Sequence, residues 1–310
     1  MEFNYIKCHG SGNEFVMVDA VKYNFEGIDL AEFSRFICNR ESAVGADGVL
    51  LLVERNGIYG MRMFNPDGSE AEMCGNGIRC VARLAEEYAG SRKFDMFSGG
   101  NIYHITREED IYPAIPTYSV DLGVRLASDD FGFTKGAEQF ISKRIEALDT
   151  TLLWTAINVG NPHIVAKVED IDYDHLTHLG KRVLELQDEF PKGINVSLVK
   201  VQGNNHIFVA TYERGAGITA SCGTAMTSSA TAMALNGHCD YEALIEVENR
   251  GGAVRCICHK DGGLHTQLIG NASYISYGNV VAEDGKFSYT ENGKFEEEIA
   301  LYDEFLTHRR

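Results

Sequence analysis

The stretch CGNGIR at residues 74–79 and the stretch CGTAMT at residues 222–227 each place a Cys-Gly pair at the start of a predicted helix. The residue numbers 222 and 74 differ by 148, and this offset also relates other residues of the two halves. It maps Gly12-Asn13 onto Gly160-Asn161, Gly45 onto Gly193, Asp47 onto Asn195, and Phe64-Asn65 onto Tyr212-Glu213. Ordered matches at one offset indicate an internal duplication, and this period is far too long for a solenoid. We therefore predict two lobes of similar fold.

Composition narrows the class of protein. A chain of 310 residues is expected to form about two domains. The formal net charge of −17 disfavours a nucleic-acid partner, which requires a basic surface, and an anionic membrane surface. The sequence has no apolar run of about 18 residues, which a transmembrane helix needs, and Met1–Tyr5 does not resemble a signal peptide. Eight scattered cysteines do not form a disulfide framework, so we expect a cytoplasmic protein.

Local patterns predict an α+β fold made mostly of strands. The expected helices cover residues 30–39, 77–89, 174–187, 224–236 and 297–308, and the expected strands alternate with glycine-rich turns. Asp29 is a suitable N-cap for the first helix, and Gly90 and Gly237 are expected to end the two helices that follow the cysteines. We predict an N-terminal lobe at 1–127, completed by 275–290, a C-terminal lobe at 128–274, and a surface tail helix within 291–310. The turn-rich stretch 128–136 would be the boundary.

The position of the two cysteines suggests acid–base chemistry. The start of a helix presents unpaired N–H groups and a positive dipole end, which lower the pKa of a thiol and bind anions such as a carboxylate. If the lobes face each other, Cys74 and Cys222 would lie on opposite sides of one carbon. A thiolate could then remove an α-proton while the opposed thiol returns one, with N–H groups stabilising the charge that develops on the carboxylate. Such α-proton exchange on an amino acid requires no cofactor in principle.

The other cysteines favour structural roles. Cys8, Cys38, Cys80 and Cys239 are expected to be small buried apolar residues. Cys256 and Cys258 alternate within a predicted strand, and the usual zinc spacing is absent, so we expect no metal site.

Longer motifs carry a resemblance to a known family. The sequence NPDGS at 65–69, followed four residues later by CGNGIR, resembles the signature of diaminopimelate epimerases. A second motif consists of ERGAG at 213–217, Thr219 and CGT at 222–224. The stretches GSGNEF at 10–15 and GNPH at 160–163 are similar to other landmarks of the family. The resemblance extends from about Cys8 to Ala282.

This resemblance implies two lobes, each a β-barrel around a central helix, and a PLP-independent epimerase that needs no cofactor. Cys74 and Cys222 would be its two acid–base thiols, in an enzyme of lysine and cell-wall precursor synthesis that acts as a homodimer. The reacting carboxylate would lie against Gly75-Asn76 and Gly223-Thr224, with His163 and Glu213 as supporting polar residues. The second carboxylate and amino group of the substrate would be held by the remaining matching residues, which are Asn13, Asn65, Asn161, Asn195 and Arg214.

The sequence also departs from the family pattern. Ile218 stands where the family often has Glu, Gly48 where some members have Gln, and Ala225-Met226-Thr227 alters the usual run of small residues. The C-terminal tail is also longer. Two alternatives therefore stay open. One is a PLP-independent racemase of another amino acid such as histidine, and the other is a non-catalytic amino-acid-binding or thiol-redox protein.

Overall fold

The computed structural model describes residues 1–127, 131, 139–148 and 151–307. The chain forms two compact units, which we call unit 1 (residues 1–120 and 269–310) and unit 2 (residues 121–268). The predicted boundary stretch 128–136 lies outside the described residues, apart from Phe131. Among the helices that the structure describes, none is long and apolar enough to span a membrane.

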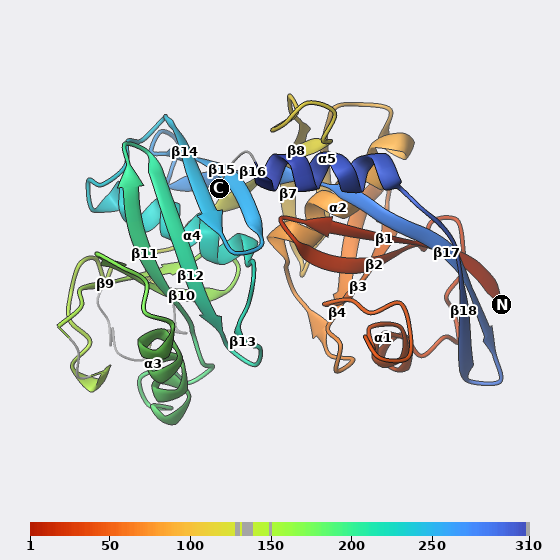
Figure 1. Ribbon diagram of the computed structural model, residues 1–310, viewed down its shortest axis with the longest axis horizontal. Helices are drawn as coiled ribbons and strands as arrows, with labels where there is room; N and C mark the ends of the chain where they lie inside the picture. The colour runs from red at the N-terminus through yellow and green to blue at the C-terminus, as the bar shows by residue number, and fades with distance from the viewer. Residues whose placement is uncertain (128–130, 132–138, 149–150, 308–310) are drawn as a thin grey trace. The chain divides into compact units, whose positions relative to one another are not determined.

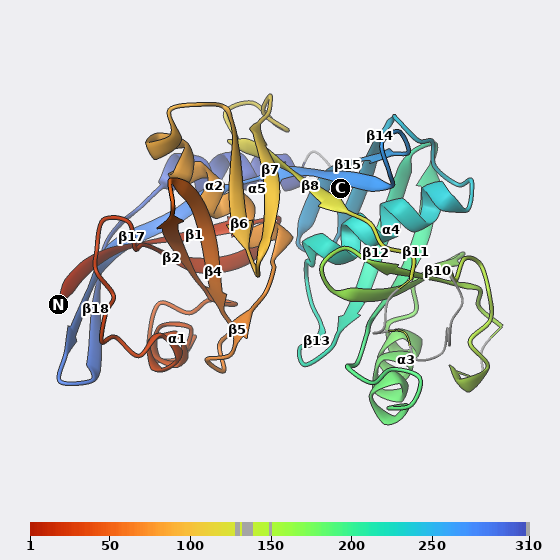
Figure 2. The ribbon, with the colours of Figure 1, turned by 180° about the vertical axis from the view of Figure 1, so that it is seen from behind.

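Unit 1 is a mixed sheet that wraps around one helix (Figures 1 and 2). Its elements are β1 (Glu2–Gly10), β2 (Asn13–Asp19), α1 (Leu30–Ile37), β3 (Val49–Arg55), β4 (Ile58–Phe64), β5 (Glu70–Ala71), α2 (Gly75–Ala89), β6 (Lys93–Ser98), β7 (Asn101–Arg107), β8 (Thr117–Gly123), β17 (Ser273–Glu283), β18 (Lys286–Lys294) and α5 (Glu296–Thr307). Strand β1 pairs with β2 and β17, and β17 also pairs with β18. Strands β2 and β3 are parallel, β3 and β4 antiparallel, and β4 runs parallel to β6. Helix α2 contacts β1, β2, β3, β4 and β6, so it is the central helix of this unit.

Unit 2 repeats the same plan. Its elements are η2 (Glu146–Leu148), β9 (Trp154–Asn158), β10 (Pro162–Val168), α3 (Tyr173–Glu185), β11 (Asn195–Gly203), β12 (His206–Glu213), β13 (Gly217–Ile218), α4 (Gly223–Leu235), β14 (Leu244–Asn249), β15 (Gly252–His259) and β16 (His265–Asn271). Strands β10 and β11 are parallel, β11 and β12 antiparallel, and β12 runs parallel to β14. Helix α4 contacts strands on all sides, namely β9, β10, β11, β12, β14 and β15.

The order of elements confirms the duplication. A parallel strand pair flanks a capped helix in each unit, α1 in the first and α3 in the second, and an antiparallel hairpin follows. A two-residue strand then precedes the central helix, and another hairpin comes after it. The predicted α+β class, with a sheet around a central helix in each half, is confirmed.

Local sequence explains where the helices begin and end. The side chain of Asp29 accepts a hydrogen bond from the Glu32 N–H, and Asp172 caps α3 in the same way. Gly90 ends α2 with φ of 60°, and Gly237 follows α4 with φ of 74°, a region of backbone space that favours glycine. Both glycines were expected at these points.

Helix α5 has a buried face. The sequence predicts a surface helix at the tail, and its observed bounds agree closely with the predicted ones up to Thr307. Tyr302 is 6% exposed and Phe305 is 2% exposed, so this otherwise largely exposed helix packs one face against unit 1. Residues 291–294, which belong to the predicted tail segment, are in strand β18.

Candidate active site

Cys74 is the N-cap residue of α2. Its backbone is extended, and its half-buried Sγ accepts a hydrogen bond from the Gly77 N–H at 3.4 Å. Gly77 permits a close approach of α2 to the sheet, because a Cβ at this position would lie 2.8 Å from Leu50 Cδ2. Gly77 therefore lets the first turn of α2 lie close to β3, with the Cys74 thiol at the positive end of the helix.

Asn76 and Asn13 are joined in unit 1. Asn76 is fully buried, and its Nδ2 donates to Asn13 Oδ1 at 3.3 Å. Asn13 Nδ2 in turn donates to Asp47 Oδ2 at 2.9 Å. The β1–β2 turn thus presents Asn13 beside the first turn of α2, and Asp47 fixes the orientation of the Asn13 amide.

Arg79 anchors the start of α2 from within. Its side chain is fully buried and donates to the Gly75 carbonyl at 2.9 Å and to Asn76 Oδ1 at 3.0 Å. It also donates to Ser11 Oγ at 3.2 Å and to the Asn271 carbonyl at 3.3 Å. A buried guanidinium with this many acceptors is held rigidly, so it orients the groups that it touches.

Asn65 belongs to a separate turn of unit 1. Its Nδ2 donates to Ser69 Oγ at 3.0 Å, and its backbone N–H donates to the Ser69 carbonyl at 2.8 Å. These bonds shape the NPDGS turn, while Asn13 and Asn76 form their own pair.

Cys222 is the N-cap residue of α4. Its half-buried Sγ lies 3.4 Å from Thr224 Oγ1, and Thr224 is itself buried. Burial and the negative charge of Glu213 raise the pKa of the Cys222 thiol well above its ordinary value, against the effects of Thr224 and the Ala225 N–H. The expectation that the helix start lowers the thiol pKa is therefore wrong for Cys222, because desolvation and a neighbouring carboxylate outweigh the dipole.

The carboxylate beside Cys222 is itself held in place. Glu213 is the last residue of β12, and its Oε1 accepts a hydrogen bond from the Thr219 hydroxyl. Thr219 follows the short strand β13, so the loop that leads to Cys222 positions this carboxylate. Glu213, Thr219 and Cys222 therefore form one acid–base cluster in unit 2.

A second chain of polar residues in unit 2 joins most of the remaining candidates. His163 Nε2 lies 2.8 Å from Asn161 Oδ1 and 3.5 Å from Asn195 Nδ2. Asn195 Oδ1 accepts a hydrogen bond from the Arg214 N–H at 3.0 Å. Burial, with a smaller effect of the Arg214 charge, lowers the pKa of His163 to about 3. The ring is therefore neutral at neutral pH, and Nε2 carries the proton that Asn161 accepts.

The exposed guanidinium of Arg214 is bound on one side only. Its Nη1 donates to the Lys192 carbonyl at 2.8 Å. Within the residues that the structure describes, it makes no ion pair with an acidic side chain. Its charge is therefore available to a carboxylate of a ligand.

Gly48 and Ile218 are two positions at which the sequence departs from the family pattern, and the structure shows what packs around each. A Cβ on Gly48 would lie 2.9 Å from the Phe64 carbonyl oxygen and 3.1 Å from Met63 Cε, so a larger residue would require both to shift. Ile218 packs against the core cluster of unit 2 rather than carrying a charge. The acidic group beside Cys222 is supplied by Glu213.

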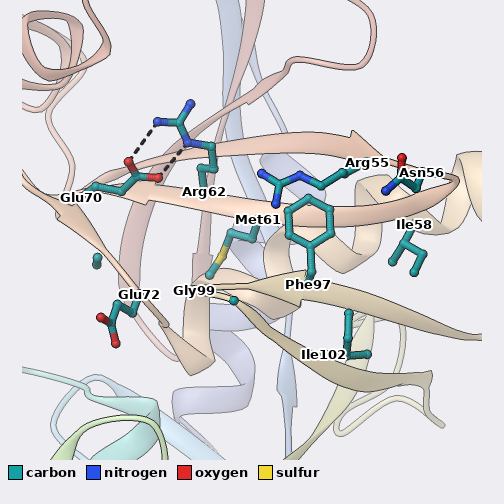
Figure 3. Close-up of a pocket in the computed structure, with 12 residues that line it drawn as sticks. Arg55, Asn56, Ile58, Met61, Arg62, Glu70, Glu72, Phe97, Gly99 and Ile102 are labelled. Atoms are coloured by element: carbon teal, nitrogen blue, oxygen red, sulfur yellow. Dashed lines mark hydrogen bonds and ion pairs between the residues drawn. The ribbon is translucent and has the colours of Figure 1, made fainter.

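Unit 1 also contains a hollow of about 450 Å³ between β4, β5 and the β6–β7 hairpin (Figure 3). Arg62 and Glu70 are paired at its rim, and the Arg55 guanidinium lies 5.2 Å from the centre of the Phe97 ring. None of the candidate catalytic or binding residues lines this hollow. It is therefore distinct from the cysteine sites.

The remaining cysteines are buried, as expected. Cys8, Cys38, Cys80 and Cys239 are in the core, and Cys256 and Cys258 lie at buried positions of β15. In the described part of the chain, the His, Cys, Asp and Glu side chains form no group of three or more that could hold a metal ion.

Three residues that organise these clusters have no role that the sequence predicts. Arg79 and Thr219 lie within the motifs quoted above, and Asp47 is the repeat partner of Asn195. The repeat was a usable signal for Asp47, since Asn195 and Asp47 each orient a neighbouring polar group of their own unit. Burial of Arg79 could not be read from sequence, because arginine is normally exposed.

The arrangement within each unit suits proton transfer next to a carboxylate. Each unit offers a thiol and the N–H groups of a helix start, and unit 2 adds the neutral His163 and the Glu213 carboxylate.

Comparison with known proteins gives consistent results. The sequence profile of the family described as diaminopimelate epimerase matches residues 5–112 and 155–275. The diaminopimelate epimerase of Clostridium acetobutylicum is 37% identical over 319 residues, covering 100% of this chain and 96% of that protein. The diaminopimelate epimerase of Listeria innocua is 33% identical, covering 98% of this chain and 95% of that protein.

Solved structures with the same fold have low sequence identity. A phenazine biosynthesis protein of the PhzF family from Bacillus anthracis has a TM-score of 0.66 at 17% identity, covering 91% of this chain and 100% of that one. A probable proline racemase from Agrobacterium radiobacter has a TM-score of 0.62 at 13% identity, covering 91% and 93%. At such low sequence identity, these similarities show a shared fold.

Proposed function

The chain belongs to the diaminopimelate epimerase family, and from this premise we propose that it interconverts LL- and meso-diaminopimelate by α-proton exchange between two thiols. It is an isomerase. The observation that carries the proposed chemistry is the repeated Cys-Gly at the start of both central helices, with a raised thiol pKa at Cys222.

Cys74 and Cys222 would act on opposite faces of the α-carbon. In one direction a thiolate removes the α-proton and becomes a thiol, while the opposed thiol donates its proton to the other face and becomes a thiolate. The reverse reaction exchanges these roles, so the enzyme needs no net proton. The raised pKa of Cys222 favours its protonated form, which supports a role as the proton donor in the resting enzyme.

The carboxylate next to the reacting carbon would bind at the two helix starts. The N–H groups at Gly75-Asn76 and Gly223-Thr224 are the donors available there. These donors stabilise the negative charge that develops on the carboxylate as the α-proton leaves, as an oxyanion hole does. His163 would orient the reacting amino group and Glu213 the thiol, while Asn13 would join the residues that hold the distal end of the substrate.

A substrate with a second carboxylate fits the other polar residues best. Arg214 has a guanidinium without an acidic partner in the described chain, and Asn65, Asn161 and Asn195 offer amide groups for the distal amino acid end. A histidine substrate has no second carboxylate, so this arginine favours diaminopimelate. We propose further that the enzyme works in the cytoplasm as a homodimer without PLP, in the synthesis of lysine and peptidoglycan precursors, and that its partner is this amino acid rather than nucleic acid or membrane.

Proton exchange observed by NMR in D₂O tests the proposal. The reduced protein without PLP is given LL-diaminopimelate or L-histidine. We expect deuterium at the α-position of diaminopimelate, and a loss of at least about 10³-fold in this rate for Cys74→Ala and for Cys222→Ala. Cys38→Ala and Cys239→Ala remove a buried thiol from the same unit in each case and should keep the exchange rate.

Other outcomes separate the alternatives. Exchange with histidine alone would move the protein to the racemase alternative. Full turnover in Cys74→Ala, or a Cys74–Cys222 disulfide that is required for function, would support the binding or thiol-redox alternative, because oxidation should inactivate an epimerase that uses both thiols.

A further inference from the structure

Helix α5 is bonded to the central helix of unit 1. Glu298 receives a two-pronged ion pair from Arg83 of α2, at 2.7 and 2.8 Å, and both side chains are 19% exposed. Glu298 Oε2 also accepts the Tyr274 N–H at 2.9 Å. The Arg83 guanidinium lies 3.6 Å from the centre of the Tyr274 ring. A largely buried, two-pronged pair of this kind has a defined geometry, so α5 restrains the position of α2.

The same helix contacts the strand that leads into the β1–β2 turn (Gly10–Gly12). The ring of Tyr302 packs edge-on against His9, with centroids 4.3 Å apart, and both residues are buried. His9 Nδ1 accepts a hydrogen bond from the Gly12 N–H at 3.2 Å. Burial lowers the pKa of His9 to about 4, so the ring is neutral and Nδ1 can accept at neutral pH.

The β1–β2 turn needs this support because its backbone is unusual. Ser11 has a φ of 54°, which is energetically unfavourable for a residue with a side chain, and Gly12 has a φ of 79°. The Ser11 N–H donates to Asn271 Oδ1 at 2.7 Å, and Asn271 Nδ2 lies 3.4 Å from His9 Nδ1. Asn13 follows this turn directly, so its position depends on the turn.

From these contacts we infer that Tyr302 and Glu298 are positioning residues for the reaction. Glu298 acts through Arg83 on helix α2, which begins at Cys74. Tyr302 acts through His9 on the turn that presents Asn13. The inference rests on the proposed function for what Cys74 and Asn13 do. Both positioning residues lie after residue 275, where the family profile match ends.

The first test compares Tyr302→Ala with a matched core variant. Phe33→Leu alters a fully buried ring that packs on Phe3 and Phe287, so it weakens unit 1 without touching the His9 contact. All variants are assayed at a temperature where circular dichroism shows them folded. Tyr302→Ala should lower kcat/KM for diaminopimelate about tenfold or more, because a small displacement of a site residue has a large kinetic effect. Phe33→Leu should stay within about twofold of the wild type, and Tyr302→Phe, which keeps the ring contact with His9, should retain more activity than Tyr302→Ala.

Glu298→Gln tests the other contact. It keeps the shape of the side chain but removes the charge that Arg83 pairs with, and it should also lower kcat/KM. Equal kinetic effects of Tyr302→Ala and Phe33→Leu would overturn the inference, since α5 would then only stabilise the fold.

Amide hydrogen exchange supplies a second readout that does not depend on activity. Exchange at Ser11 and Gly12 should be about tenfold faster in Tyr302→Ala than in the wild type, and unchanged in Phe33→Leu. If the wild type did not turn over diaminopimelate, the proposed function would fail. The positioning contact would still stand if Ser11 and Gly12 exchanged faster in Tyr302→Ala than in the wild type. Unchanged exchange in Tyr302→Ala would refute the positioning contact whatever the activity.

Discussion

Glu213 adds to the effect of burial on the protonation of Cys222. Burial and this carboxylate together raise the pKa of the thiol well above its ordinary value. Glu213→Gln removes the negative charge while keeping the size of the side chain, so the thiol pKa should fall and the thiolate fraction at pH 8 should rise. We expect iodoacetamide to alkylate Cys222 faster in this variant, measured by mass spectrometry of the Cys222 peptide. An unchanged rate would mean that burial alone sets the pKa.

Arg214 is predicted to select for a second carboxylate. Arg214→Gln removes the charge, so kcat/KM for diaminopimelate should fall about 10- to 100-fold, since a charge-assisted hydrogen bond contributes about 1.5–3 kcal/mol. Arg214→Lys keeps the charge but lacks the planar guanidinium. Its kcat/KM for diaminopimelate should therefore lie between those of the wild type and Arg214→Gln. Steady-state kinetics checks both. Equal kinetics of Arg214→Gln and the wild type would contradict a role in substrate binding.

At the residue scale, the sequence predicts that Cys74 and Cys222 stand at helix starts, but it does not predict the electrostatics of Cys222. The glycine after Cys222 and the internal repeat predict a helix start at Cys222, and the structure confirms it. The direction of the Cys222 pKa shift could not be predicted, because burial, its main cause, depends on the fold, and the Glu213 carboxylate stands at the end of β12, nine positions earlier in the chain. Only the folded β12–β13 connection brings this charge to the thiol.

At the scale of elements, Gly180 lets α3 pack closely on β12. A Cβ at this position would lie 2.1 Å from Tyr212 Cγ, so Gly180→Ala forces the helix and the ring apart. In an exposed helix this substitution stabilises by about 1 kcal/mol. Here we expect it to lower the free energy of unfolding by about 1–3 kcal/mol, measured by urea denaturation. Lys181→Ala, at the exposed neighbouring position, serves as the control and should change stability little.

Most elements could be predicted because their signals are local. Asp29 and Asp172 cap their helices, and Gly90 and Gly237 adopt the left-handed backbone that their places after the central helices suggested. The buried face of α5 could not be predicted, because Tyr302 and Phe305 stand among acidic residues and their partners are remote in sequence. His9 and Tyr112, which contact them, lie far earlier in the chain.

At the scale of the whole molecule, one buried neutral histidine in each unit makes stability depend on pH. Burial lowers the pKa of His9 to about 4 and that of His163 to about 3. In the unfolded chain a histidine titrates near 6.5, so below this pH the unfolded state binds protons that the folded state does not. This contribution to stability is present above pH 6.5 and is lost as the pH falls toward 4.

We therefore expect the free energy of unfolding to decrease by at most about 1.4 kcal/mol per pH unit for each of these histidines, with the steepest decrease near pH 5. Urea denaturation at several pH values measures the slope. His163→Gln removes one of the two titrating histidines. The part of the slope of the unfolding free energy against pH that comes from His9 and His163 together should therefore fall by about half. A slope that is identical in this variant would show that His163 is protonated in the folded state.

The pairing of β1 with β17 has a consequence for the order of events on the ribosome. Glu2 stands opposite Val281 in this ladder, whereas unit 2 is built from one continuous stretch, residues 121–268. At a synthesis rate of about 5–20 residues per second, β1 can pair with β2 at once but waits for tens of seconds before β17 is made. Unit 2 is complete by then. Strand β1 therefore leaves the ribosome with one edge open, and this edge is a template for wrong pairing until β17 has been made.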